Sequence, residues 1–70
     1  MEVKYFIQDV KTGEYYWRYQ IHEGFNANIS EATSFETYEN AEKELMQEYL
    51  IDLDITSGRF LEIVKYYDFT

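Results

Sequence analysis

Two stretches of alternating apolar and polar residues lie on either side of residues 10–13, and this pattern constrains the fold more than any other feature of the chain. A period of two over residues 3–8 and 14–21 is typical of β-strands. The intervening segment suits a type I turn followed by Gly13 in the left-handed region. That turn sets a register that brings apolar residues onto one face as the pairs Val3 with Ile21, Tyr5 with Tyr19 and Ile7 with Trp17. The sequence therefore predicts a β-hairpin over residues 3–21.

The second face of this hairpin mixes basic, aromatic and amide side chains, namely Lys4, Phe6, Gln8, Tyr16 and Arg18. We expect Phe6, Tyr16 and Arg18 to be exposed there as candidate protein-contact residues, because exposed aromatic and arginine side chains are enriched at binding hot spots. Two other interpretations stay open. One is a platform for single-stranded nucleic acid, and the other is an ordinary solvated sheet face.

A helix is predicted after residue 37, where apolar residues recur at helical spacing in the stripe Tyr38, Ala41, Leu45 and Tyr49. Thr37 or Ser34 can cap its N-terminus, and a turn over residues 54–58 ends it. The polar segment 22–34 alternates weakly, which leaves room for a short strand around residues 25–29 or at 33–36. Residues 59–69 predict a last strand that is apolar on both sides and is therefore either covered on both faces or exposed.

These elements define one α+β domain over residues 1–70. We expect an antiparallel-rich sheet of three to four strands, with the helix packed on the face that carries Val3, Tyr5 and Trp17. The chain has 70 residues and no cysteine, so neither a disulfide nor a thiolate metal site stabilises it. Burial of its 14 aromatic residues (8 Tyr, 5 Phe and 1 Trp) is the remaining means of stabilisation.

Fourteen acidic residues against six basic ones give the chain a formal net charge of -8. Such a charge repels nucleic-acid backbones and anionic membranes and attracts basic protein surfaces. We therefore expect a protein partner with a basic surface, and no direct binding to nucleic acid or to a membrane. The N-terminal residues do not resemble a signal peptide and no apolar run has the length of a membrane span, so we expect a cytoplasmic protein.

The inventory of reactive side chains is small. His22 is the single histidine, and the three glycines are too far apart to form a phosphate-binding loop. A nucleophilic site would need His22 and a carboxylate with Ser30, Ser34 or Ser57, and a zinc site would need His22 with carboxylates alone. We expect neither, and we predict a protein with no catalytic residues, no metal and no cofactor.

The segment from Ala32 to Leu45 follows the predicted hairpin and contains the pattern A-x-x-F-x-T-x-E-x-A, with Ala32, Phe35, Glu39 and Ala41 at the matching positions. It resembles a segment common in small phage and mobile-element proteins. The resemblance covers about half of the chain. It implies an accessory protein, and some such proteins inhibit host defence nucleases through acidic surfaces.

These observations together predict a non-catalytic protein-binding accessory protein. In a sharper form of the hypothesis, the chain mimics nucleic acid and inhibits a host DNA-processing or defence enzyme through an acidic helix face formed by Glu36, Glu39, Glu44 and Glu48. The alternative is a homodimeric structural or interaction domain without nucleic-acid mimicry, in which a second copy covers the other sheet face or pairs with an edge strand.

Overall fold

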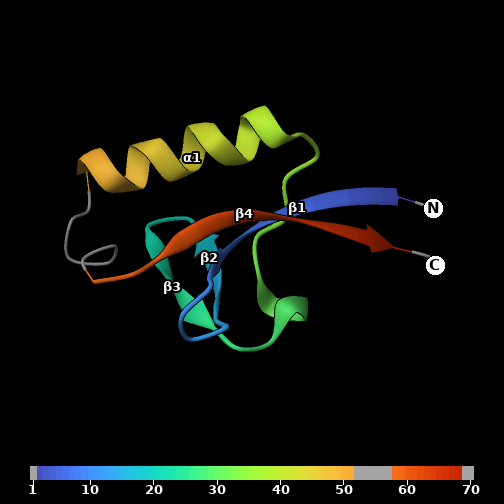
Figure 1. Ribbon diagram of the computed structural model, residues 1–70. Helices are drawn as coiled ribbons and strands as arrows, with labels where there is room; N and C mark the ends of the chain where they lie inside the picture. The colour runs from blue at the N-terminus through green and yellow to red at the C-terminus, as the bar shows by residue number, and fades with distance from the viewer. Residues whose placement is uncertain (1, 52–57, 69–70) are drawn as a thin grey trace.

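The computed structural model describes residues 2–51 and 58–68 of the chain. A four-stranded antiparallel sheet in the order β3-β2-β1-β4 carries one long helix on one face (Figure 1). Along the chain the elements are β1 (Glu2–Asp9), β2 (Tyr15–Tyr19), β3 (His22–Asn26), the 3-10 turn η1 (Ile29–Glu31), α1 (Tyr38–Ile51) and β4 (Leu61–Asp68). The predicted α+β class, with an antiparallel sheet and one helix on it, is confirmed.

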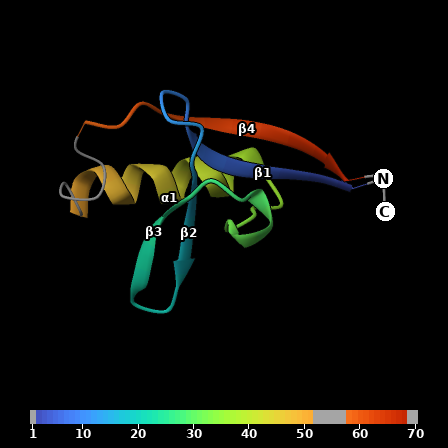
Figure 2. The ribbon, with the colours of Figure 1, turned by 90° about the horizontal axis from the view of Figure 1, so that it is seen from below.

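The sheet consists of two well-paired ribbons that are joined at one corner. β1 and β4 pair along eight residue pairs, from Glu2 with Asp68 to Asp9 with Leu61, and β2 and β3 pair along five. In contrast, β1 and β2 pair at Gln8 with Tyr15 and then separate. Figure 2 shows the two ribbons diverging from this corner, with β2 and β3 running steeply away from β1 and β4.

The segment before α1 fills the gap between the diverging strands. Phe35 exchanges two backbone hydrogen bonds of 2.8 Å with Tyr5 of β1. Two residues earlier, the Thr33 N–H donates to the Tyr16 carbonyl at 3.1 Å, and the Arg18 N–H donates to the Thr33 hydroxyl at 2.7 Å. This segment therefore satisfies backbone groups that β1 and β2 would otherwise offer to each other. The short strand anticipated at residues 33–36 is present as this bridge.

The first turn confirms one prediction and corrects another. Gly13 adopts a positive φ of 82°, as predicted, and its N–H donates to the Asp9 carbonyl at 2.7 Å. However, Asp9 pairs with Glu14 and Gln8 with Tyr15, which shifts the hairpin by one residue from the predicted register. The predicted pairs of Ile7 with Trp17, Tyr5 with Tyr19 and Val3 with Ile21 are wrong.

The physical reason for the shift lies in the Asp9 side chain. Its carboxylate accepts a hydrogen bond of 3.0 Å from the Lys11 N–H, which folds the loop back at Asp9 rather than at the next residue. A shift of one residue turns every side chain of the second strand to the other face. Tyr16 and Arg18 consequently lie on the helix side, and Trp17 lies on the opposite side rather than beneath the helix as predicted.

A second hairpin follows where the sequence predicted a continuing strand. Tyr19 pairs with His22, so Gln20 and Ile21 form a two-residue turn in which Gln20 has a φ of 56°. Ile21 is 90% exposed as a result, and the predicted extension of the strand to this residue is wrong. The weakly alternating segment contributes β3 at His22–Asn26, earlier than the predicted 25–29.

α1 begins as predicted and packs on β1 and β4. The Asn40 N–H donates to the Thr37 hydroxyl at 3.1 Å, so Thr37 rather than Ser34 caps the helix. Ala41 is fully buried where the helix meets the sheet, and the Tyr38 ring stands edge-on to Tyr5 at 6.1 Å between centroids. The predicted helix-ending turn falls mostly on residues 54–57, outside the described residues.

Candidate functional site

The aromatic and basic face predicted from the hairpin does not exist in that form. Phe6 and Tyr16 are 6% and 1% exposed, so the expectation that they are surface residues is wrong. Phe6 packs edge-on against Tyr15 and Tyr66, with ring centroids about 6 Å apart, on the sheet face away from α1. Tyr16 packs against Phe25 on the helix side, and its hydroxyl donates to Glu23. The shift in register separates the two aromatic residues that the sequence placed together.

Arg18, the third predicted contact residue of that face, is exposed as predicted, with 46% of its side chain accessible, but it forms an ion pair within the fold. Its guanidinium donates a hydrogen bond of 2.8 Å to the Glu44 carboxylate of α1. This ion pair joins β2 to the helix, and the Glu44 side chain is only 20% exposed. Glu44 is thus not part of a free acidic helix face, which corrects its predicted role.

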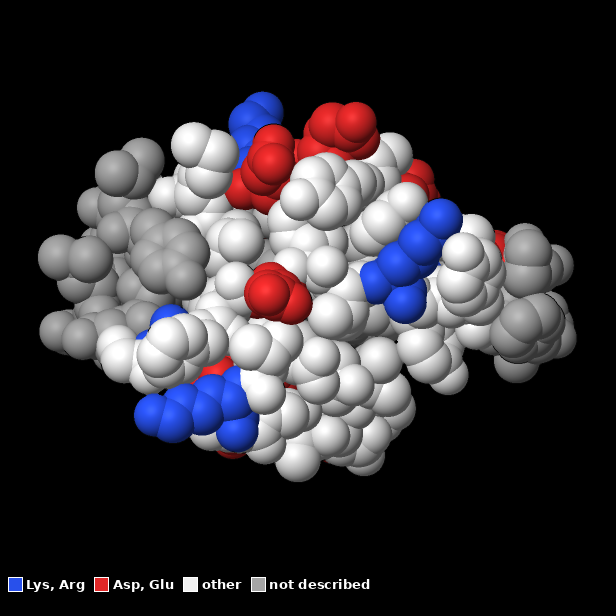
Figure 3. Space-filling view, viewed as in Figure 1, with Lys and Arg blue, Asp and Glu red and all other residues white. Residues whose placement is uncertain are grey.

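The N-terminal part of α1 keeps the acidic character that the sequence predicts. Glu36, Glu39 and Glu42 are all exposed, and within the described residues none of the three forms an ion pair. We call these three residues the acidic cluster. In Figure 3, acidic side chains lie at the top of the view, over α1, with a basic side chain beside them, and the surface below is mostly uncharged apart from separate basic and acidic side chains. Glu48, the fourth predicted residue, belongs to α1, but its side chain lies outside the described part.

Several basic side chains form ion pairs with carboxylates outside the acidic cluster. Lys4 lies 3.9 Å from Glu2, Arg18 pairs with Glu44, and Arg59 contacts two carboxylates. Three of the six basic residues are therefore partly neutralised within the fold. The distribution leaves the acidic cluster as a local excess of negative charge.

A buried ionic cluster that the sequence did not predict joins the first turn to the start of β4. Asp9 is 2% exposed, and its carboxylate accepts a hydrogen bond of 3.0 Å from Arg59. The same guanidinium lies 3.1 Å from Glu14 and stacks 3.7 Å above the centre of the Phe25 ring. Asp9 alone is fully buried, since the Arg59 and Glu14 side chains are 27% and 34% exposed, and the residues of the cluster belong to or flank all four strands of the described sheet. We call these four residues the Asp9 cluster.

The Asp9 carboxyl is charged in this environment. Burial raises the pKa of Asp9, but hydrogen bonds to the carboxylate from the Lys11 N–H, from Arg59 and from the backbone of Phe60 and Thr12 together lower it by more. The net pKa therefore lies below the ordinary value of 3.8. A spacing of fifty residues separates Asp9 from Arg59, and no local sequence signal marks such a pair.

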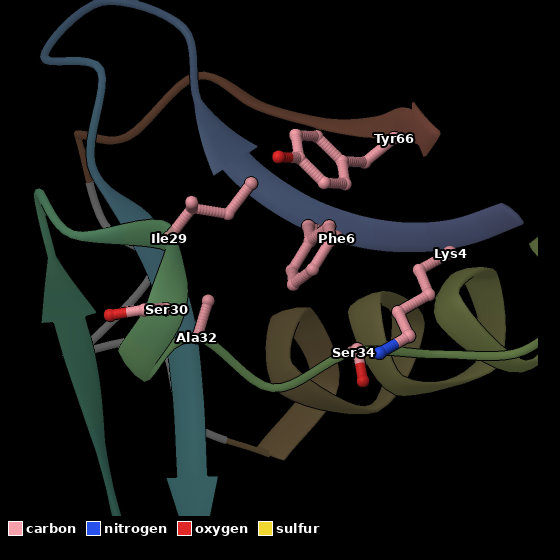
Figure 4. Close-up of a pocket in the computed structure, with 7 residues that line it drawn as sticks. All are labelled: Lys4, Phe6, Ile29, Ser30, Ala32, Ser34 and Tyr66. Carbon is pink, nitrogen blue, oxygen red and sulfur yellow. The ribbon is translucent and has the colours of Figure 1, made fainter. Parts of the chain in front are cut away.

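A shallow pocket of about 290 Å³ opens on the sheet face opposite α1, between β1, β4 and η1 (Figure 4). Its lining combines aromatic rings of Phe6 and Tyr66 with the Lys4 ammonium and the hydroxyls of Ser30 and Ser34. Figure 4 shows Lys4 extending across the pocket toward Ser34. This chemistry suits a hydrogen-bond acceptor or a small anion, although the volume is at the small end for a ligand pocket.

The residues that line this pocket can be compared with the nucleophilic site considered from the sequence, which would need His22 and a carboxylate with Ser30, Ser34 or Ser57. His22 is exposed at the start of β3 and is not one of the residues that line the pocket with Ser30 and Ser34. Ser57 lies outside the described residues. Within the described part of the chain, no group of three or more His, Asp or Glu side chains is arranged to hold a metal ion.

Among residues 2–51 and 58–68, no helix has the length and apolar character needed to cross a membrane. Comparisons of the chain with protein-family models, curated proteins and solved structures find no match.

Proposed function

We propose that the chain is a non-catalytic protein-binding module that docks on a basic surface of another protein through the acidic cluster. The observation that carries this proposal is the presence of three exposed carboxylates at and just before the start of α1 that form no ion pair within the described residues, in a molecule where half of the basic side chains pair with other carboxylates. Electrostatic complementarity of this kind speeds encounter with a basic partner and selects against acidic ones.

In the sharper form of the proposal, the partner is a host DNA-processing or defence enzyme and the acidic cluster imitates a nucleic-acid strand. Glu39 and Glu42 are three residues apart on α1, which corresponds to a rise of about 4.5 Å along the helix axis. Phosphates of one DNA strand follow each other at about 3.4 Å along the duplex axis. A basic channel built for phosphates would therefore meet carboxylates at a comparable spacing. The A-x-x-F-x-T-x-E-x-A segment resembles a segment of small phage and mobile-element proteins. In this proposal the chain is a cytoplasmic accessory protein of that class.

The experiment compares two variants of equal charge. Glu36→Gln/Glu39→Gln removes two carboxylates of the acidic cluster, and Glu2→Gln/Glu31→Gln removes two exposed carboxylates outside it. Each protein is immobilised and incubated with a bacterial lysate, and the captured proteins are challenged with duplex DNA and with increasing salt. We expect the wild type and the second variant to retain a protein that DNA displaces and that salt weakens steeply, and the first variant to lose it.

Two results would contradict the proposal. Equal loss of the captured protein in both variants would mean that net charge, and not the acidic cluster, causes binding. Capture that is insensitive to DNA would exclude the nucleic-acid mimic while leaving the protein-binding module. The homodimeric domain is the second candidate function, and the exposed edge of β4 favours it.

A further inference from the structure

Among the strands that the structure describes, β4 is an edge strand, and none of them pairs with its outer side. The strand order places β4 at the end of the sheet, and Figure 2 shows it along the margin of the molecule with β1 on its inner side. The Val10 N–H donates to the Phe60 carbonyl at 2.9 Å, so Phe60 directs its backbone groups toward β1. Because these directions alternate in an antiparallel ladder, the N–H and C=O groups that point outward belong to Leu61, Ile63, Lys65 and Tyr67.

A groove runs beside this edge on the helix side of the sheet. It has a volume of about 360 Å³ and lies between α1 and β4, lined by Tyr38, Glu42, Leu45, Leu61, Glu62 and Ile63. We call it the edge groove. Its lining is mixed: Leu45, Leu61 and Ile63 contribute apolar groups, Tyr38 contributes a ring and a hydroxyl, and the acidic residues Glu42 and Glu62 contribute polar groups. An aromatic side chain with a nearby positive charge is the occupant that such a lining fits.

β4 itself carries that combination on the same face. Tyr67 is 45% exposed, and the Lys65 ammonium lies 5.3 Å from the centre of its ring. The strand holds one basic and two acidic residues, for a net charge of -1, in a chain of net charge -8. Glu42 of the acidic cluster also lines the edge groove, so the Lys65 ammonium of a second copy would meet an opposite charge there.

We propose that β4 pairs antiparallel with β4 of a second copy about a two-fold axis at Val64, so that Tyr67 of each copy enters the edge groove of the other. The axis is perpendicular to the sheet, which keeps both helices on one face of a continuous eight-stranded sheet. In this register the cross-strand pairs are Leu61 with Tyr67, Glu62 with Tyr66, Ile63 with Lys65, and Val64 with itself.

The side chains of this register are complementary. Tyr67 of the second copy lies opposite Leu61, at the edge groove, and Lys65 of the second copy lies opposite Ile63, on the side of the sheet where Glu42 lines the groove. On the other face, Glu62 faces the Tyr66 hydroxyl, an acceptor opposite a donor. Each contact occurs twice by symmetry, and the residues with outward backbone groups, 61, 63, 65 and 67, pair with one another.

Single cysteines test the register directly, because the chain has none of its own. Val64 faces its own copy in a non-hydrogen-bonded pair, with Cα atoms about 4.5 Å apart, which a disulfide bridges readily. Two copies of residue 62 would lie about 13 Å apart along the strands. Under mild oxidation we expect Val64→Cys to form a covalent dimer and Glu62→Cys, the matched control, to remain uncrosslinked. Equal crosslinking at both positions, or none at residue 64, would overturn the register.

A backbone variant tests the pairing itself. Lys65→Pro removes an outward N–H and leaves the hydrogen bonds to β1 in place, whereas Lys65→Ala removes the side chain and keeps the N–H. By light scattering across a dilution series, we expect the wild type and Lys65→Ala to have twice the 8.5 kDa of the single chain and Lys65→Pro to be monomeric. A wild type that is monomeric at every concentration, or a Lys65→Pro variant that stays dimeric, would refute the proposal. A strand of another protein bound at β4 would appear as the first of these results.

Discussion

The Arg59 guanidinium lies 3.0 Å from the carboxylate of Asp9, a residue fifty positions earlier in the chain. This contact ties the start of β4 to the loop between β1 and β2, at the corner where the two ribbons of the sheet meet. It also fixes the register of the first hairpin, because Asp9 binds the loop N–H of Lys11 with its other oxygen. One buried carboxylate thus decides which aromatic residues face the helix.

We expect the charge of Asp9 to make stability depend on pH. The pKa of Asp9 is lower in the folded chain than its ordinary value of 3.8, so its contribution is fully present above that value. It is lost as the pH falls through the lowered folded pKa. Urea unfolding of the wild type and of Asp9→Asn should therefore differ most near neutral pH and converge in strong acid. A difference that stays constant down to the lowest pH would contradict this assignment.

Arg59→Lys should destabilise the fold by about 1–3 kcal/mol, because lysine cannot both stack on Phe25 and reach two carboxylates. Arg18→Lys is the matched control. Its pair with Glu44 is more open, with Arg18 46% exposed, so the same change should cost less than about 1 kcal/mol. Chemical unfolding of both variants measures the two values. Equal costs would mean that the Asp9 cluster has no special role.

Gln20→Gly should stabilise the protein by about 1 kcal/mol. Gln20 adopts a φ of 56° in the turn between β2 and β3, a conformation that is unfavourable for residues with a Cβ and accessible to glycine. Gln20→Ala keeps the Cβ and should give no such gain. Thermal unfolding of the three proteins tests the prediction, which fails if the alanine variant gains as much as the glycine variant.

Gly24→Ala should destabilise the protein by no more than about 1 kcal/mol, because a Cβ at this position would lie 3.1 Å from the Trp17 ring, which has to shift by a few tenths of an ångström. Trp17 pairs with Gly24 across the β2–β3 ladder and covers it. In a Trp17→Leu background the same substitution should cost less, since the crowded ring is gone. A double-mutant cycle measured by urea unfolding checks this coupling. Additive effects would show that the ring does not cause the cost.

Local signals in the sequence are sufficient to predict most of the secondary structure, but not the register in which the strands pair. The Thr37 cap, the helical spacing from Tyr38 to Leu45 and the left-handed Gly13 all act within a few residues, and the structure has all three. The turn at Gln20 and Ile21 was missed because it contains no Gly, Asn or Asp to mark it. The strand that ends there was consequently predicted to be too long.

The candidate site likewise contains residues that local sequence signals identify and residues whose role depends on contacts between distant parts of the chain. The sequence predicts Glu39 as an exposed helix acid from its position relative to the apolar stripe and Glu36 as an exposed acid just before the helix, and both are exposed. Glu44 was assigned to the same face, yet it binds Arg18, twenty-six residues away in the chain. Phe6 and Tyr16 were misplaced by the shift in register. A contact between distant positions leaves no periodic trace in a single sequence.

The sequence by itself determined that this chain forms strands around Gly13, a capped helix and an apolar last strand, because backbone propensity and side-chain period are properties of neighbouring residues. Only the tertiary structure decided the register. Residues 15–17 are Tyr, Tyr and Trp, so either alternation buries an aromatic ring and the hydrophobic pattern favours neither. Asp9 favours one of them: its carboxylate binds the Lys11 N–H within the loop, and the pairing of its other oxygen with Arg59, which forms only in the folded chain, holds that carboxylate in place.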